Sequence, residues 1–573
     1  MNSFNAKNYL SLLPYLVYGV AAFLTFIVVE EDAFIYFRLA QNMADGYGIV
    51  FNRGGEHIES GSSLIWQGML AVLAMLPVHL VIATKLLGVL FAVLSLWKLT
   101  ALSRQWIADP YLALLPAILL AGSTPFYYWS HRGLETPLFV FLLLVWVEWV
   151  TDDRKVRYWF VPAWLLVCAR PEGFLMVLAL LPWLWLSRTR MAHFVRNTFL
   201  FNTLLFAAGW FAVELWRWYY FHDLVPHPFY LKFGGDLVRP WHDMQQYSVW
   251  NGFILLVVLS LPACFTRRAW QKQDFPLWLM LAVTTLWGVL GADWKSFNRQ
   301  LASWLPWVYL LGVMLASRCP VSLLQKKLIF AILSLYAVAV IIFSPYTSAD
   351  GQTKWSPALG CIKLWWQHPQ EYSANVISAT VNPEHYFTQQ EPALAGDYIG
   401  FNRNATVGRF IQLNYPRGIT VVFDQVGQAP WYAGLDKVFI DNTGLTDKTI
   451  GYYEFHQRAS QSALLRNYEQ VLWYLKSEFW PTDHPLATRE AIINNILVRK
   501  PELILVRERY VEREENSLIA GVLFDPHFAL QYRRSWRLNK RDVVYERRDL
   551  PIISQVKTPP GALVEPLADL AIH

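Results

Sequence analysis

The sequence has few charged residues: Asp, Glu, Lys and Arg together fill only 16% of its 573 positions. Soluble domains carry about 25%, so this low fraction excludes an ordinary soluble protein over most of the chain. Long basic runs are also missing, and the formal net charge is only +6. These two features exclude a nucleic-acid-binding protein.

Cysteine is scarce as well, with four residues in the chain. No CxxC pair and no Cys/His spacing typical of zinc ligands occurs, which argues against a disulfide framework and a structural zinc site. Cys168, Cys264 and Cys319 lie in or beside apolar segments, and Cys361 lies in the polar C-terminal region. We expect them to be small buried side chains.

Hydrophobic residues, by contrast, make up 55% of the chain, which also contains 28 Trp and 28 Tyr. The mean hydropathy is +0.26. Tryptophan and tyrosine gather at both interfaces of a bilayer, so this composition predicts a polytopic α-helical membrane protein. The first apolar run, 9–29, ends in three acids instead of a cleavage motif, which predicts a retained helix.

Eleven apolar stretches are long enough to cross a bilayer. They occupy residues 10–29, 80–101, 110–128, 134–150, 156–170, 172–187, 197–220, 249–266, 276–291, 300–317 and 328–344. A further candidate, 62–79, is short and bounded by Ser, Pro and His, and we expect it to lie along the outer surface. Every strongly basic short loop then falls inside, as the positive-inside rule requires. The sequence therefore predicts about eleven spans, outer juxtamembrane helices, an inner N-terminus and an outer C-terminus.

Two domains are predicted, 1–344 in the membrane, with a first outer loop at 30–79, and 345–573 outside the cytoplasm. The composition turns polar after Ser344. Short β-rich runs at 418–423, 437–441, 503–506 and 543–545 alternate with helical patterns near 403–413, 462–477 and 486–498. This alternation predicts an extracytoplasmic α/β domain.

Ionisable residues of both signs gather at the predicted outer ends of the helices, beginning with Glu30, Glu31 and Asp32. Charged groups beside lipid are costly unless they are used or well hydrated. For the set as a whole, this arrangement favours a functional site over a row of snorkelling anchors.

The first outer loop resembles that of GT-C glycosyltransferases that use polyprenyl-phosphate sugars, and more narrowly the group of the mycobacterial terminal arabinofuranosyltransferase and the bacterial pilin arabinosyltransferase. The matching residues are Glu31-Asp32, Arg38, Asn42, Gly46, Gly48, Phe51-Asn52, Gly55-Glu56, Glu59 and Trp66. Further matches are Trp129 to Thr136, Arg170 to Gly173, Asp223 to Lys232, Gly291 to Trp294 with Arg299, Asp424 to Gly427, and Gly444 to Asp447. Their order and spacing cover nearly the whole chain.

This resemblance implies an enzyme of a bacterial cytoplasmic membrane. It would move a sugar, D-arabinofuranose in the narrower reading, from a polyprenyl-phosphate donor to a glycan or a pilin-like protein outside. The chain departs from the family pattern where Glu31 replaces an Asp, where 60–64 replaces an aromatic-containing run, and where His227-Pro228 replaces Asn and a small hydroxyl residue. These changes affect the identity of sugar and acceptor more than the reaction class.

The chemistry requires cations for the departing phosphate and a carboxylate near the reacting sugar or the acceptor hydroxyl. We expect Asp32 to be that carboxylate, with Glu31 second, acting either as a general base or directly on the sugar. The phosphate-binding candidates are Arg132, Lys232, Lys295 and Arg299. Glu59 and Glu135 would bind sugar hydroxyls or orient the arginines. Arg38, His227 and Asp293 are assigned to substrate binding because they occupy motif positions.

No metal or other cofactor is predicted, although a divalent cation can bridge outer acids through oxygen ligands. Relatives with monophosphate lipid donors generally do without a metal. Alternatives are transfer of a hexose or of aminoarabinose to a lipid or protein, and a non-enzymatic glycan-lipid transporter. A transporter predicts internal repeats and charges near the midplane, and neither pattern occurs in the sequence.

Overall fold

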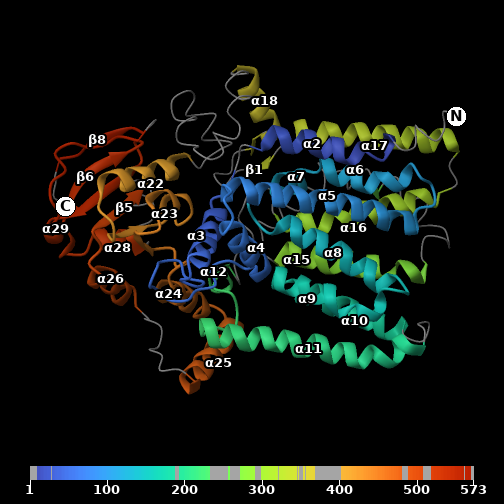
Figure 1. Cartoon of the computed structure of the whole chain (residues 1–573), viewed down its shortest axis with the longest axis horizontal. Coiled ribbons are helices and arrows are strands. Elements are labelled where there is room, and N and C mark those ends of the chain that lie inside the picture. Colours follow the sequence, from blue (N-terminus) through green and yellow to red (C-terminus); the bar gives the residue numbers. More distant parts are fainter. Residues whose placement is uncertain are drawn as a thin grey trace.

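A computed structural model describes most of the chain (Figure 1). The described residues are 9–26, 29–187, 193–232, 254, 256–257, 271–290, 299–319, 322–344, 346–347, 353–354, 356–367, 402–479, 488–507, 518–559 and 562–568.

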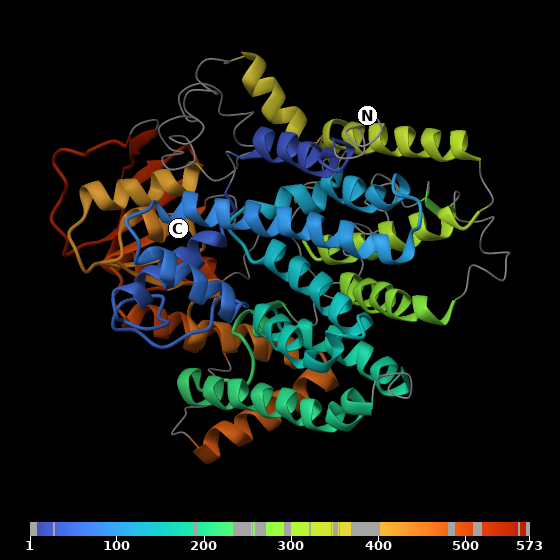
Figure 2. The ribbon, with the colours of Figure 1, turned by 45° about the vertical axis from the view of Figure 1, so that its right-hand side comes forward.

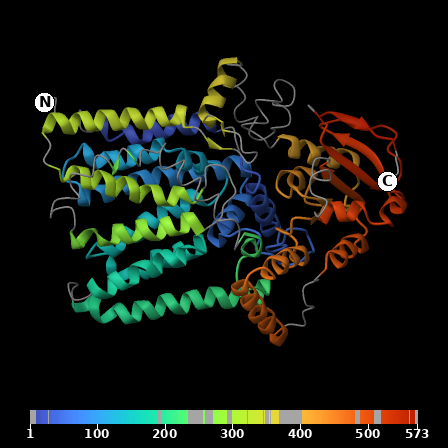
Figure 3. The same cartoon turned by 180° about the vertical axis from the view of Figure 1, so that it is seen from behind.

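The largest part of the structure is a bundle of helices that run side by side, seen from opposite sides in Figures 1 and 3. Its helices are α2 (Leu13–Thr25), α5 (Leu80–Trp106), α6 (Leu115–Gly122), α7 (Thr124–Ser130), α8 (Thr136–Thr151), α9 (Phe160–Ala169), α10 (Gly173–Ser187), α11 (His193–Phe221), α15 (Phe275–Leu290), α16 (Leu301–Ser317) and α17 (Leu323–Phe343), with short 3-10 turns at Leu112–Leu114 and Val156–Tyr158. Apolar side chains from most of these helices form one continuous core.

Ten of the eleven predicted spans coincide with helices of this bundle, and 249–266 lies almost entirely outside the described residues. By length and composition, three helices are able to cross a membrane: Leu80–Trp106, Phe199–Phe221 and Leu323–Phe343. A fourth span is added if α6 and α7, which meet at a bend of 62°, count together. The chain is thus a membrane-protein fold, and the count of eleven stays a prediction.

Two helices of the first outer loop, α3 (Ala33–Ala44) and α4 (Leu64–Ala74), lie at one end of the bundle (Figure 1). Ser63 starts α4 by accepting a hydrogen bond from the Trp66 amide at 3.2 Å. Eleven residues give a helix of about 16 Å, which is too short for a hydrocarbon core of about 30 Å. Helix α9, which lies in a predicted span, has only ten residues, so length does not separate the two and the expectation that 62–79 does not cross stays a prediction.

A six-stranded sheet forms the centre of the C-terminal domain beyond that end, in the order β4-β3-β5-β7-β6-β8. The strands are β3 (Thr420–Phe423), β4 (Val438–Asp441), β5 (Leu503–Arg507), β6 (Tyr532–Leu538), β7 (Asp542–Arg547) and β8 (Val564–Pro566). β3 pairs in parallel with β4 and β5, and the other pairs are antiparallel. The predicted α/β domain is confirmed; β6 and β8 were not predicted, since β6 (YRRSWRL) has no alternation of apolar and polar residues.

Helices cover both faces of this sheet. They are α22 (Asn402–Asn414), α23 (Gln428–Ala433), α24 (Lys448–Ala459), α26 (Arg489–Val498), α28 (Leu518–Leu523) and α29 (Phe528–Gln531). Helix α25 (Ala463–Phe479) packs on α24, and α18 (Pro357–Gln367) lies nearer the bundle. Alternate strand residues enter two cores: Val421 belongs to one and Val422 to the other.

The first of these cores also contains residues of the first outer loop. Ile35 and Leu39 of α3, with Phe51 from the following turn, pack against Phe410, Val421 and Phe439 of the C-terminal domain. The domain is therefore fixed to the outer end of the bundle through a shared apolar core, which fixes where its loops lie relative to the helix ends.

The orientation in the membrane predicts where fusions will be exposed. A reporter that is active only outside the cytoplasm should be active when fused after Ser344 and inactive after Arg318, because α17 separates these two positions and the basic residues near Arg318 favour the inside. The opposite pair of activities would contradict the predicted orientation.

Candidate functional site

The second outer loop, 129–136, is folded against α5 and the start of α3. Pro125 lies in the first turn of α7, next to the bend that ends α6. Gly88 of α5 allows the loop to approach: a Cβ there would lie 2.2 Å from the Ser130 carbonyl oxygen. Gly133, at φ +94°, abuts Ala33 in the same way, and its carbonyl accepts the Trp66 indole N–H at 3.1 Å.

Arg132 occupies the centre of this loop and is completely buried. Its Nε donates to the Tyr128 carbonyl at 3.2 Å, and its guanidinium lies 3.5 Å from the centre of the Tyr128 ring. Its two terminal nitrogens have no hydrogen-bond partner among the described residues. A buried guanidinium left in this state is costly, and an anion bound there would remove that cost.

Lys85 of α5 lies beside Arg132 and is also completely buried. Its ammonium group is 4.7 Å from the centre of the Phe26 ring, and its charge interacts repulsively with that of Arg132. Lys85 precedes Gly88 by three residues, so both face the second outer loop. An anion bound between these two buried basic side chains would stabilise the charged form of both.

Glu31 and Asp32 lie next to these basic side chains but in different surroundings. The Glu30 amide donates to the Arg132 carbonyl at 3.1 Å, which fixes the acids beside the loop. Glu31 accepts the Gln428 amide at 2.9 Å, at the start of α23. Asp32 is the N-cap residue of α3, yet its side chain makes no capping hydrogen bond there. Glu31 thus anchors the C-terminal domain, whereas Asp32 is partly exposed.

Glu135 belongs to a buried group around Tyr36 of α3. Its carboxylate lies 3.6 Å from Nε of Arg170, which pairs more closely with Glu172 at 2.6 Å. Tyr36 interacts electrostatically with Glu135, Arg170 and Arg299. The structure therefore brings Glu135 and Arg299 into one neighbourhood around Tyr36.

Glu59 and His227 meet further along the first outer loop. Glu59 forms a bidentate pair with Arg217 of α11, at 2.6 and 3.2 Å, and its carbonyl accepts the His227 amide. The His227 Nε2 atom lies 2.8 Å from the Gly444 carbonyl. Lys232 is the last residue of α12 (Pro228–Lys232). Asp293 and Lys295, the two other predicted site residues, lie outside the described part of the chain.

Arg38 has a different environment from Arg132, although both are fully buried. Its guanidinium donates to the carbonyls of Phe51, Pro430 and Lys437, at 2.8, 2.8 and 2.6 Å. It also donates to the Gly434 carbonyl at 3.2 Å. Its role in substrate binding stays a prediction, and its contacts support a structural role between the first loop and the C-terminal domain.

We expect Arg38→Met to destabilise the C-terminal domain by about 3–5 kcal/mol, because several charge-assisted hydrogen bonds are lost and buried carbonyls remain. Limited proteolysis and thermal unfolding would measure this change. Arg53→Met is the matched control, because the Arg53–Asp45 pair is partly exposed and should contribute less than about 1 kcal/mol. Equal stability of the two variants would contradict the structural role.

Burial lowers the pKa of His227 to about 4, with the nearby Asp223 carboxylate opposing this shift. Because the folded-state pKa lies below the unfolded value of about 6.5, the neutral ring supports the fold fully above pH 6.5 and loses up to about 3 kcal/mol as the pH falls toward 4. His227→Asn should remove this contribution. Thermal unfolding of both proteins from pH 7 to pH 4 would measure it, and parallel curves would contradict the prediction.

The chain resembles known proteins in its structure and not in its sequence. No protein-family model and no curated protein sequence matches the chain. The crystal structure of ArnT from Cupriavidus metallidurans bound to undecaprenyl phosphate matches with a TM-score of 0.52 at 11% identity, covering 94% of this chain and 98% of ArnT. Its apo form gives 0.50 at 12% identity, with the same coverage.

The chain has a GT-C-type fold. The Archaeoglobus fulgidus oligosaccharyltransferase tethered to an acceptor peptide is also similar, with a TM-score of 0.45 and 11% identity, over 98% of this chain and 76% of that one. Identities this low establish the fold alone.

Within this GT-C fold, sequence reasoning missed Lys85 and Arg217. Both lie inside predicted spans, and an ionisable residue within an apolar span is itself a signal of a functional or paired group. Asp223 was noted in a motif but was not assigned to the site. It is buried, accepts hydrogen bonds from Tyr230 and Tyr452, and pairs with Lys476 at 2.9 Å.

Among the residues that the structure describes, no group of three or more His, Cys, Asp and Glu side chains is placed to hold a metal ion. The expectation that the enzyme needs no metal stays a prediction.

Proposed function

We propose that this protein is a membrane glycosyltransferase that uses a polyprenyl-phosphate sugar as donor. The observation that carries the proposal is the buried Arg132 guanidinium, whose terminal nitrogens have no partner among the described residues, next to the buried Lys85. The GT-C-type fold supports the same reaction class. The site lies at the end of the bundle that faces the C-terminal domain, which we place outside the cytoplasmic membrane.

The proposed chemistry follows from the charges. A guanidinium presents a planar fork that matches phosphate oxygens, and a lysine adds a point charge. Together they would stabilise the negative charge that grows on the departing lipid phosphate. Asp32, partly exposed beside them, would either remove the acceptor's proton or stabilise the reacting sugar.

The other predicted residues have positioning and binding roles in this proposal. Arg299, Lys232 and Lys295 would add positive charge for the donor phosphate. Glu135 would orient Arg170 or bind a sugar hydroxyl, and Glu59 would hold Arg217. His227 and Asp293 would contact substrate from the loops that carry them. Glu31 would support Asp32 from its position at α23.

We also propose D-arabinofuranose as the sugar, because the first outer loop resembles that of arabinofuranosyltransferases. The acceptor would be a cell-surface glycan or a pilin-like protein. A hexose or aminoarabinose donor is the alternative, and the departures at Glu31 and 60–64 bear on this choice.

The test is purified full-length protein in lipid nanodiscs with a panel of polyprenyl-phosphate sugars, including arabinofuranose, aminoarabinose and a hexose. Mass spectrometry would detect transfer to acceptor or release of polyprenyl phosphate. Turnover of the arabinofuranose donor alone is the expected result. Turnover of another donor would reject the sugar but keep the reaction class, and movement of an intact donor between leaflets without turnover would favour a transporter.

A further inference from the structure

Helix α25 has an apolar surface that the rest of the described chain leaves uncovered. Its buried side, with Leu465, Leu472 and Trp473, packs in a small core with α24 and the residues after α11. On the other side, Val471, Tyr474 and Phe479 are 56%, 65% and 65% exposed. Exposed apolar residues that gather on one helix need an apolar partner.

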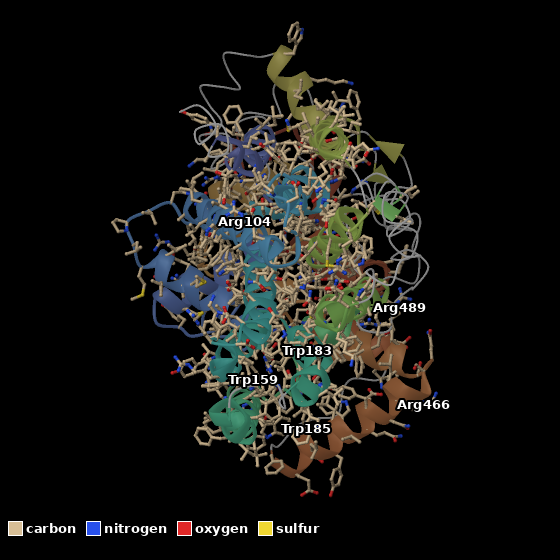
Figure 4. The ribbon with its side chains drawn as sticks, turned by 90° about the vertical axis from the view of Figure 1, so that its right-hand side faces the viewer. Arg104, Trp159, Trp183, Trp185, Arg466 and Arg489 are labelled. Carbon is tan, nitrogen blue, oxygen red and sulfur yellow. The ribbon has the colours of Figure 1, made fainter. Side chains whose placement is uncertain are left out.

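The position of α25 indicates what this partner is. The helix lies crosswise to the bundle at the outer end of α11, as Figures 1 and 2 show from two angles. In the view along the bundle, it extends past the bundle's edge, with Arg466 near its outer end (Figure 4). The rings of Phe479 and Trp218 meet at 6.1 Å, which fixes α25 within about one turn of the end of α11.

Helix α11 supplies the second part of the argument, because the described part of the chain leaves most of its apolar surface uncovered. Phe199–Phe221 is one of the three clear candidate spans, and only 17% of its apolar window is buried in the protein. Its exposed apolar surface continues to Tyr219, which is 71% exposed and directly follows Trp218, the residue that meets Phe479. Aromatic residues at this depth are typical of the bilayer interface.

We propose that α25 is an in-plane membrane helix whose apolar face, formed by Val471, Tyr474 and Phe479, docks into the outer leaflet beside α11. The lipid-covered surface of α11 would then continue without a break onto the C-terminal domain. Arg466 and Ser477 lie about 120–140° around the helix from Val471 and would remain in water. The exposed Glu478, which is next to Val471 and Tyr474 on the helix surface, would extend to the lipid headgroups. This contact holds the C-terminal domain at a fixed height above the bilayer, and it is independent of the proposed glycosyl transfer.

The test uses the full-length protein in nanodiscs of phosphatidylethanolamine and phosphatidylglycerol. A benzophenone-bearing phenylalanine replaces Val471 in one variant and Ser477 in the matched control, which lies on the polar side of the same helix. After illumination, mass spectrometry would count lipid adducts. We expect lipid adducts at 471 to exceed those at 477 by about tenfold or more, since apolar interfacial residues contact acyl chains. Thermal unfolding would confirm that both variants fold.

Equal adduct yields at the two positions, or more adducts at 477, would overturn the proposal. Adducts between position 471 and a second copy of the chain, in place of lipid, would also overturn it and would assign this face to a protein interface. A folding failure of the variant at 471 is resolved by placing the same probe at Phe479, which lies about 160° around the helix from Ser477 and for which the expected and contradicting results are the same.

Discussion

Replacing Asp32 by Asn should lower the rate of sugar transfer by about 10²–10⁴-fold, which is the usual contribution of a general base or acid. The substitution keeps the shape of the side chain and removes only its charge. Because Asp32 is partly exposed and asparagine fills the same space, the variant should fold with nearly unchanged stability. Transfer rates and thermal unfolding of the same preparations would measure both effects.

Asp45→Asn is the matched control for Asp32→Asn. Asp45 is the residue that follows the last turn of the same helix, and it is exposed and paired with Arg53. Its substitution should leave transfer near the parent rate. If Asp32→Asn folds and retains full activity, the catalytic assignment of Asp32 is wrong. A loss confined to Glu31→Gln would move the role to its neighbour.

Arg132→Met should separate stability from function. We expect activity to fall by about 10²–10³-fold, the loss typical when a group that stabilises a developing anion is removed. At the same time, thermal stability should rise, because an unsatisfied buried donor costs about 1–3 kcal/mol and methionine fills similar space. Polyprenyl phosphate, which should raise the unfolding temperature of the parent, should no longer do so in the variant.

Arg170→Met is the control for this effect. Arg170 is also buried at the outer end of the bundle, but it pairs with Glu172 at 2.6 Å and lies near Glu135. Removing it leaves buried carboxylates uncompensated and should destabilise the protein by about 3–5 kcal/mol. A loss of stability in Arg132→Met as large as in Arg170→Met would reject the anion site and make Arg132 a structural residue.

The two predictions rest on different parts of the site, and their outcomes are separable. Asp32→Asn should keep polyprenyl phosphate binding and lose transfer, since the cations remain. Arg132→Met should lose both binding and transfer. A protein that only carries a glycan lipid would need Arg132 but not Asp32, so the pair of variants also distinguishes an enzyme from a transporter.

The sequence by itself determined the class of protein and the position of most elements. Long apolar runs can be stable only in lipid or a large core, so ten predicted spans coincide with helices. The alternation of β-rich and helical runs likewise predicted β3, β4, β5 and β7. These features are set by residues that are close together in the chain, so the sequence alone is enough to predict them.

Only the tertiary structure distinguished the charged residues from one another. Arg38 and Arg132 both follow motif residues in outer loops, yet Arg38 donates to carbonyls 392 and 399 residues away, whereas the terminal nitrogens of Arg132 meet no partner in the described chain. Glu31 and Asp32 are adjacent, yet Glu31 is buried and accepts the Gln428 amide at the start of α23, whereas Asp32 is partly exposed. Whether a buried charged residue holds the fold together or is left to bind a ligand depends on the distant groups around it. An unpaired buried charge is costly, and a partner reduces that cost. That information arises only when the first outer loop and the C-terminal domain share one core.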